Sequence, residues 1–208
     1  MDGRPSLRRD FLCGSAGLAT TAAALQAQAQ SQSAATDFAI FVEYSPQNKK
    51  MMPGWNRRVF TDTEARKGDS IRCDSVTGVV TLAPGSYHLS GLSIVGYDSS
   101  KEPPEMTATR SPAAAGYCRV RRINGDPGPE QLDLRAIDNA DPSVVCIGSM
   151  SSANLVPSLF ETFLAASQIT RLLVEHQTGS NPQDVLLRAF IGNSRWHAFA
   201  RLAVRRLQ

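Results

Sequence analysis

The chain has 208 residues, of which 42% are hydrophobic, and a formal net charge of +3. This length predicts one domain, and the composition suits a chain that can bury a core. The small net charge provides no basic stripe or patch of the kind that nucleic-acid binding needs, so we expect no nucleic-acid partner.

Residues 1–29 are predicted to be an export signal. Their motif resembles the twin-arginine signal and consists of Arg8, Arg9, Phe11 and Leu12. The apolar stretch that follows is about 15 residues long, shorter than the roughly 20 of a membrane-spanning helix. Ala27 and Ala29 form a small-x-small cleavage site. An ordinary secretory signal is the alternative. Either route predicts a periplasmic or secreted mature protein without a membrane span.

Residues 30–36 are predicted to be a polar linker, and residues 37–208 the folded domain. The domain keeps three cysteines, Cys73, Cys118 and Cys146, an odd number for an oxidising compartment. One disulfide plus one buried thiol is one expectation. Three buried thiols are the other, because twin-arginine substrates fold in the reducing cytosol before export. Without a C-x-x-C spacing, we expect no structural zinc site.

The domain begins with the continuous apolar run Phe38–Val42, which predicts a buried strand. In Val79–Tyr97, apolar residues alternate on both sides of Pro84-Gly85. This pattern predicts a hairpin-like unit with a type II turn, since glycine takes positive φ cheaply. Asp98–Gly116 is expected to be an exposed loop. Further strands are predicted at 55–61, 70–74, 117–123, 132–137, 144–148, 155–165, 168–177, 185–191 and 196–207.

Alternation within these segments assigns faces to side chains. In 168–177, Leu172, Val174 and His176 share one face, and Arg171, Leu173 and Glu175 share the other. Eight to ten short strands at fairly regular spacing are typical of a sandwich or jelly roll. We therefore predict an all-β fold, a two-sheet antiparallel jelly-roll sandwich.

The run VTLAPGSYHLSG (80–91) resembles the strand–turn–strand element of C1q/TNF-like jelly-roll domains, particularly bacterial and phage-associated ones. Later pieces follow in the order of that family, at 117–124, 144–150, 159–176 and 196–207. The resemblance implies a non-catalytic homotrimer. It also implies an interface near a threefold axis, whose candidate residues are Tyr87, Leu172, Val174, Phe199 and Leu202. Ordinary monomer core is the alternative for each of them.

No catalytic or metal-binding constellation emerges. A cupin-type metal centre needs paired histidines, whereas His88 stands alone in its strand. There is no G-x-S-x-G motif. Asp138 and Asp141 flank Asn139-Ala140, which indicates a turn, with a loop Ca²⁺ site as the alternative. We expect no cofactor.

The leading functional hypothesis is an exported binding or structural module that recognises a protein, a glycan or an envelope component through its loops. Binding would use chiefly the 98–116 loop and the 48–56 loop, and the latter carries the candidate ligand residues Met51, Met52 and Trp55. One alternative is a small exported carbohydrate-active jelly-roll enzyme, with Glu43, Glu175 and Asp98 as its available carboxylates. Another is an accessory subunit of an envelope complex.

Overall fold

The computed structural model describes residues 36–97, 114–128, 131–132, 139–178, 185–189 and 197–207. The chain divides into two units, 1–35 and 36–208, and every described residue belongs to the second. The predicted export signal and its cleavage site therefore lie outside the described residues. So do most of the 98–116 loop and residues 133–137 of a predicted strand. No helix in the described ranges is both long enough and apolar enough to cross a membrane.

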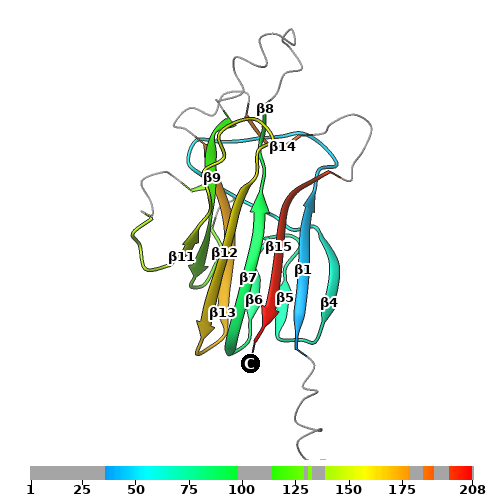
Figure 1. Cartoon of the computed structure of the whole chain (residues 1–208), viewed down its shortest axis with the longest axis vertical. Helices are drawn as coiled ribbons and strands as arrows, with labels where there is room; N and C mark the ends of the chain where they lie inside the picture. The colour runs from blue at the N-terminus through cyan, green and yellow to red at the C-terminus, as the bar shows by residue number, and fades with distance from the viewer. Residues whose placement is uncertain are drawn as a thin grey trace, which may run out of the picture. The chain divides into compact units, whose positions relative to one another are not determined.

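The described part of the second unit is built from antiparallel strands (Figure 1). The first sheet has the order β12-β7-β15-β1-β4. The second has the order β10-β3-β13-β6-β5, with β9 on β13 and β11 on β9. A small third sheet has the order β2-β14-β8. The strands are β1 Phe38–Tyr44, β2 Lys49–Lys50, β3 Trp55–Arg57, β4 Asp62–Lys67, β5 Ile71–Cys73, β6 Val80–Leu82, β7 Gly85–Ser93, β8 Gly96–Tyr97, β9 Gly116–Ile123, β10 Gln131–Leu132, β11 Val144–Ile147, β12 Ser158–Ala166, β13 Thr170–Thr178, β14 Val185–Arg188 and β15 Ala198–Arg206.

The order in which the chain visits the two large sheets defines a jelly roll. β1, β7, β12 and β15 lie in the first sheet, and β6, β9, β11 and β13 lie in the second. Among these eight strands, the chain changes sheet after β1, β6, β7, β11, β12 and β13, so that strands distant in sequence become neighbours. This connectivity is that of a double-sheet jelly roll. The predicted all-β, two-sheet antiparallel fold is confirmed.

The predicted hairpin around Pro84-Gly85 is wrong. β6 pairs with β5 and β13, whereas β7 pairs with β12 and β15. The alternating apolar residues Val80, Leu82 and Tyr87 are all buried, because β6 and β7 face each other across the core. Pro84-Gly85 is thus a corner between sheets, tied by the Tyr87 hydroxyl, which donates to the Ala83 carbonyl at 2.9 Å.

The residues predicted to lie at a trimer interface belong to the core of a single chain. The five are Tyr87, Leu172, Val174, Phe199 and Leu202, and none is more than 2% exposed. Four of them join the main hydrophobic cluster, and Phe199 packs with Leu186 and Ala189. A side chain without free surface cannot contact a second copy, so the interface assignment is corrected to its alternative, ordinary core.

The predicted ligand loop is also mostly internal. Met51 and Trp55 are buried, and only Met52 is exposed. The Asn56 side chain folds the loop inward, since its amide nitrogen donates to the Met52 and Gly54 carbonyls and its oxygen accepts from the Met52 amide. The expectation that Met51 and Trp55 are available to a ligand is therefore wrong.

The three cysteines are free thiols. Cys118 is buried, and Cys73 and Cys146 are half-buried. Burial raises the pKa of Cys73 to about 12 and that of Cys146 to about 11. The expected disulfide is therefore absent among these residues, and the three-thiol alternative describes the chain better. Thiols with raised pKa values are poor nucleophiles at neutral pH.

Candidate assembly surface

The two edge strands of the first sheet differ sharply in character. β4 has the sequence DTEARK, and charged side chains of this kind protect a free edge from pairing. β12, at the opposite edge, has nine residues, SLFETFLAA. Its Leu159 is 54% exposed and its Phe163 is 71% exposed. A long edge strand with exposed large apolar side chains is open to another chain unless something covers it.

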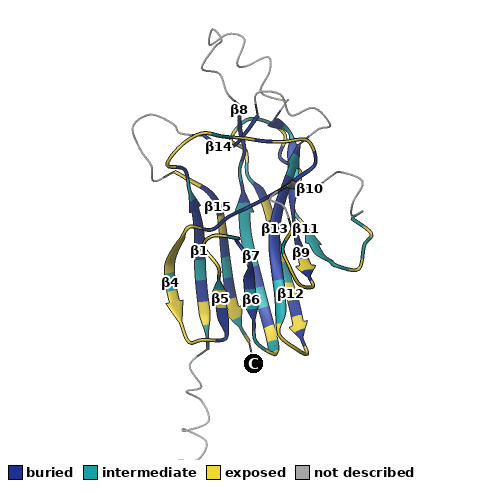
Figure 2. Cartoon of the chain, turned by 180° about the vertical axis from the view of Figure 1, so that it is seen from behind, coloured by how far each residue is buried: buried dark blue, intermediate teal, exposed yellow. Residues whose placement is uncertain are grey.

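The apolar character continues onto the neighbouring edge of the second sheet. β11 lies beside β12 there, and the Ser149 amide donates to the Leu159 carbonyl at 2.7 Å. Ile147 is 48% exposed and Met150 is 67% exposed. We call these four residues, Ile147, Met150, Leu159 and Phe163, the apolar edge. Figure 2 labels β11, which carries Ile147, and β12, which carries Leu159 and Phe163; Met150 lies in the loop after β11. The predicted buried strand at 144–148 is in fact half-buried, because β11 is an edge strand.

Alternation along β12 explains why these side chains face outward. Ser158, Phe160 and Leu164 point into the core and are buried, so Leu159 and Phe163 must point away from it. In a monomeric antiparallel sandwich, polar residues usually occupy the outward positions. β7, the neighbour of β12, follows that rule with Ser86, His88 and Ser90.

The outward face of the first sheet contains a shallow groove of about 140 Å³. Its apolar lining includes Phe38, Ile40 and Ala203, and its polar rim is formed by His88, Ser90 and Arg205. We call it the sheet groove. Strand register accounts for it, because Ile40 and Ser90 both lie opposite Ala203, whose short side chain leaves the centre hollow.

His88 and Glu161 connect the sheet groove to the apolar edge. The His88 Nε2 lies 2.7 Å from Glu161 Oε1, and its ring centroid lies 5.0 Å from that of Phe163. His88 therefore has the surface, hydrogen-bonded role that a lone strand histidine usually has. The groove, the pair and the edge together span β1, β15, β7 and β12.

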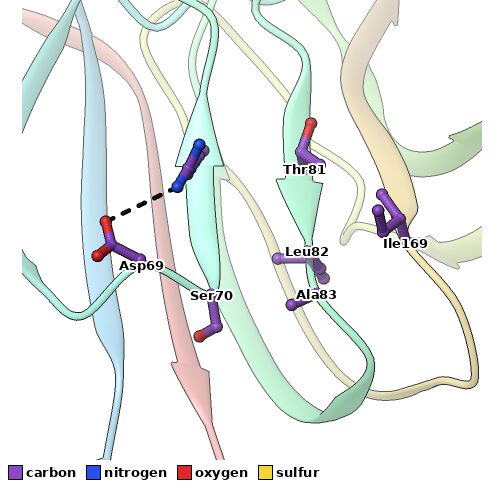
Figure 3. Close-up of a pocket in the computed structure, with 7 residues that line it drawn as sticks. Asp69, Ser70, Thr81, Leu82, Ala83 and Ile169 are labelled. Atoms are coloured by element: carbon purple, nitrogen blue, oxygen red, sulfur yellow. Dashed lines mark ion pairs between the residues drawn. The ribbon is translucent and has the colours of Figure 1, made fainter.

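A second groove, of about 200 Å³, lies on the other side of the sandwich, around β5 and β6 (Figure 3). Leu82, Ala83 and Ile169 give it apolar walls, and the exposed Asp69 and Arg72 approach to 4.0 Å at its rim. An exposed ion pair of this kind contributes little to stability. With Asp69 as the one carboxylate in its lining, this groove has no acid–base pair for glycoside hydrolysis.

Two of the three carboxylates considered for an enzyme, Glu43 and Glu175, are not free for catalysis. Glu43 is buried and lies 3.1 Å from Arg58, with burial raising its pKa against the pull of that guanidinium. Glu175 is buried between Arg119, at 2.8 Å, and Arg121, at 2.7 Å. The third, Asp98, lies outside the described residues. Glu43 and Glu175 are therefore structural, and the enzyme hypothesis loses two of its three candidates.

Two arginines of β9, Arg119 and Arg121, form an ion network on the outward face of the second sheet. Arg119 and Arg121 face away from the core, where Glu175 of β13 lies between them. The Arg119 guanidinium also stacks on the Trp55 ring at 3.8 Å, which is a cation–π contact. This ion network uses the outward positions of β9 and β13 and connects β9 to Trp55 of β3 within the second sheet.

A second polar network lies inside the sandwich. The Arg58 Nε donates to Ser93 Oγ at 2.8 Å, and Ser93 Oγ lies 2.8 Å from His176 Nδ1. The Ser93 hydroxyl therefore links the Arg58 guanidinium to the imidazole ring of His176. Burial lowers the pKa of His176 well below 6.5. Ser93 is completely buried, so this serine–histidine contact is structural and not a nucleophile site.

The described part of the Asp138–Asp141 segment, residues 139–141, forms the predicted turn. The Asp141 carboxylate accepts from the Ser143 amide at 2.8 Å, and hydrogen bonds from Ser143 lower its pKa. Asp138 lies outside the described residues. Among the residues that the structure describes, no group of three or more histidine, cysteine, aspartate or glutamate side chains could hold a metal ion.

No protein-family model matches the sequence, and no curated protein matches it. Solved structures are similar in fold. Murine APRIL, a TNF-family protein, has a TM-score of 0.48 with 11% identity, over 83% of this chain and 99% of APRIL. The globular domain of zebrafish complement 1qA has a TM-score of 0.41 with 12% identity, over 83% and 96%.

The PRD1 vertex protein P5 has a TM-score of 0.43 with 9% identity, over 83% of this chain and 98% of P5. At these values the likenesses describe the shape of the chain alone. The strand order itself, with two large antiparallel sheets visited in jelly-roll sequence, establishes the fold class.

Proposed function

We propose that the mature protein is an exported, non-catalytic binding or structural module that assembles as a homotrimer. The observation that carries this proposal is the uncovered apolar edge, with four large apolar side chains between 48% and 71% exposed on two edge strands and the loop between them. Apolar patches of this kind on a soluble protein mark interaction sites. The opposite edge of the same sheet, β4, is charged and protected, so the two edges of one sheet differ in character.

The apolar edge and the sheet groove suit each other as partners. The edge projects Leu159 and Phe163, and the groove offers an apolar floor of Phe38, Ile40 and Ala203. Contact between two unlike patches is heterologous, so repeated copies either close into a ring or extend as a filament. A ring of three agrees with the resemblance to C1q/TNF-like domains. Export, to the periplasm or cell surface, follows the predicted leader.

The decisive test is the mass of the purified mature protein in solution, measured by sedimentation equilibrium. A trimer is expected, and Phe163→Glu should shift it to monomer because a carboxylate would have to be buried at the contact. Val76→Glu is the matched control: Val76 is 79% exposed on the β5–β6 turn, away from the edge. A wild-type protein that stays monomeric at high concentration would refute the proposal and favour an accessory subunit.

A further inference from the structure

The pair formed by His88 and Glu161 is a polar contact in the middle of an otherwise apolar surface. His88 comes from β7, Glu161 from β12, and their side chains meet at 2.7 Å between the sheet groove and the apolar edge. Both side chains remain partly open to solvent in the single chain. Any second copy that covers Phe163, which the His88 ring contacts, must also cover this pair.

The charged groups around His88 can be named strand by strand. β12 contributes Glu161, and β15 contributes Arg205, which lies opposite His88 in the register. On β7 itself, the outward neighbours of His88 are Ser86 and Ser90, and β1 lines the adjacent groove with Phe38 and Ile40. Within the described residues, then, one carboxylate and one guanidinium face the imidazole. The measured contact is with the carboxylate.

Covering this pair has different consequences in its two protonation states. When the imidazole is neutral, assembly removes water from the ionised Glu161, and the only compensation is one hydrogen bond from the neutral N–H of His88. Removing water from a carboxylate on these terms costs free energy. With a protonated imidazole, the same carboxylate faces an opposite charge at 2.7 Å, and the attraction grows as water leaves. Arg205 opposes protonation, but its long side chain can keep its charged group in water.

We infer that the His88–Glu161 pair makes self-assembly pH-dependent, with tighter association at pH 5.5 than at pH 7.5. The inference rests on the proposed function, because it needs a partner that covers this face. Histidine is the side chain that changes charge across this interval. When water is excluded, the attraction between the protonated His88 and Glu161 increases modestly. We expect this increase to lower the dissociation constant of each contact between two copies about tenfold.

The experiment is sedimentation equilibrium of the mature protein at pH 7.5 and pH 5.5, at one ionic strength. The wild type should associate about tenfold more tightly at pH 5.5. His88→Gln keeps an N–H donor for Glu161 but cannot gain charge, so its association should be equal at both values. Glu161→Gln removes the carboxylate that needs compensation, so it should associate tightly at pH 7.5 and show no gain at pH 5.5.

His197→Gln is the matched control, because His197 is exposed and is not among the residues that line the groove. It should retain the wild-type dependence, and circular dichroism at both pH values checks that each variant is folded. Equal wild-type association at the two values, or pH dependence that survives His88→Gln, overturns the inference while leaving the trimer intact. A wild type that is monomeric at both values overturns the inference and the proposed function together.

Discussion

His176 should make the folded protein sensitive to mild acid, and this effect can be isolated with one substitution. Burial lowers the pKa of His176 well below its ordinary value of 6.5, with the nearby Arg58 adding to the shift. The unfolded chain therefore binds a proton below pH 6.5 that the folded chain does not. The stability that this group contributes is present above pH 6.5 and declines as the pH falls below it.

The size of the effect follows from proton linkage. Each pH unit below 6.5 lowers the free energy of unfolding by about 1.4 kcal/mol while the folded state remains unprotonated. Between pH 7 and pH 5 the loss is about 2 kcal/mol. His176→Gln should remove this dependence, because an amide does not titrate but can still hydrogen-bond to Ser93. Taking the difference between wild type and variant cancels every other titrating group.

Urea unfolding at pH 7 and pH 5, followed by the fluorescence of the buried Trp55, measures the two free energies at one fixed protein concentration. The variant is expected to have a lower free energy of unfolding than the wild type at pH 7. At pH 5 the difference between the two free energies should be smaller by about 2 kcal/mol. Parallel pH dependences for the two proteins would refute the reasoning, since His176 would then titrate alike in the folded and unfolded chains.

Three further outcomes are expected. Arg58→Met should lower the unfolding free energy by about 3–5 kcal/mol in urea titrations, because it leaves the buried Glu43 with only the longer 3.6 Å contact to Arg188; a Glu43→Leu second substitution should recover part of the loss. Gly91→Ala should cost about 1–3 kcal/mol by thermal unfolding, since the new Cβ would meet the Arg201 carbonyl oxygen at 2.4 Å, while Ser90→Ala should not. Dithiothreitol should leave the melting temperature unchanged because the three cysteines are free thiols; a marked drop would contradict this.

Local alternation was enough to identify much of the core. In β13, Leu172, Val174 and His176 were predicted to share one face, and all three are buried there. Side chains of a strand alternate with a period of two, whichever strand becomes its neighbour, so this information is present in the sequence. The same periodicity across many short segments predicted the all-β class and the antiparallel sandwich.

Pairing partners were not available from the same pattern. β6 and β7 both show clean alternation around Pro84-Gly85, yet they belong to different sheets. β4 escaped prediction because its DTEARK sequence has no apolar stripe, and its strand state depends on pairing with β1. A strand is completed by hydrogen bonds to distant segments, and alternation says nothing about which segments these are.

The proposed assembly surface depended most on the tertiary structure. The sequence LFETFLAA in β12 contains apolar residues on both faces, and it cannot state which ones the same chain covers. By itself, the sequence determined the strands with an apolar stripe, their inward faces and the all-β class, because these follow from short-range periodicity. The tertiary structure decided that Leu172 and Val174 are core, that Glu43 and Glu175 pair with arginines, and that Phe163 faces outward. Each of these outcomes depends on which distant residues become neighbours.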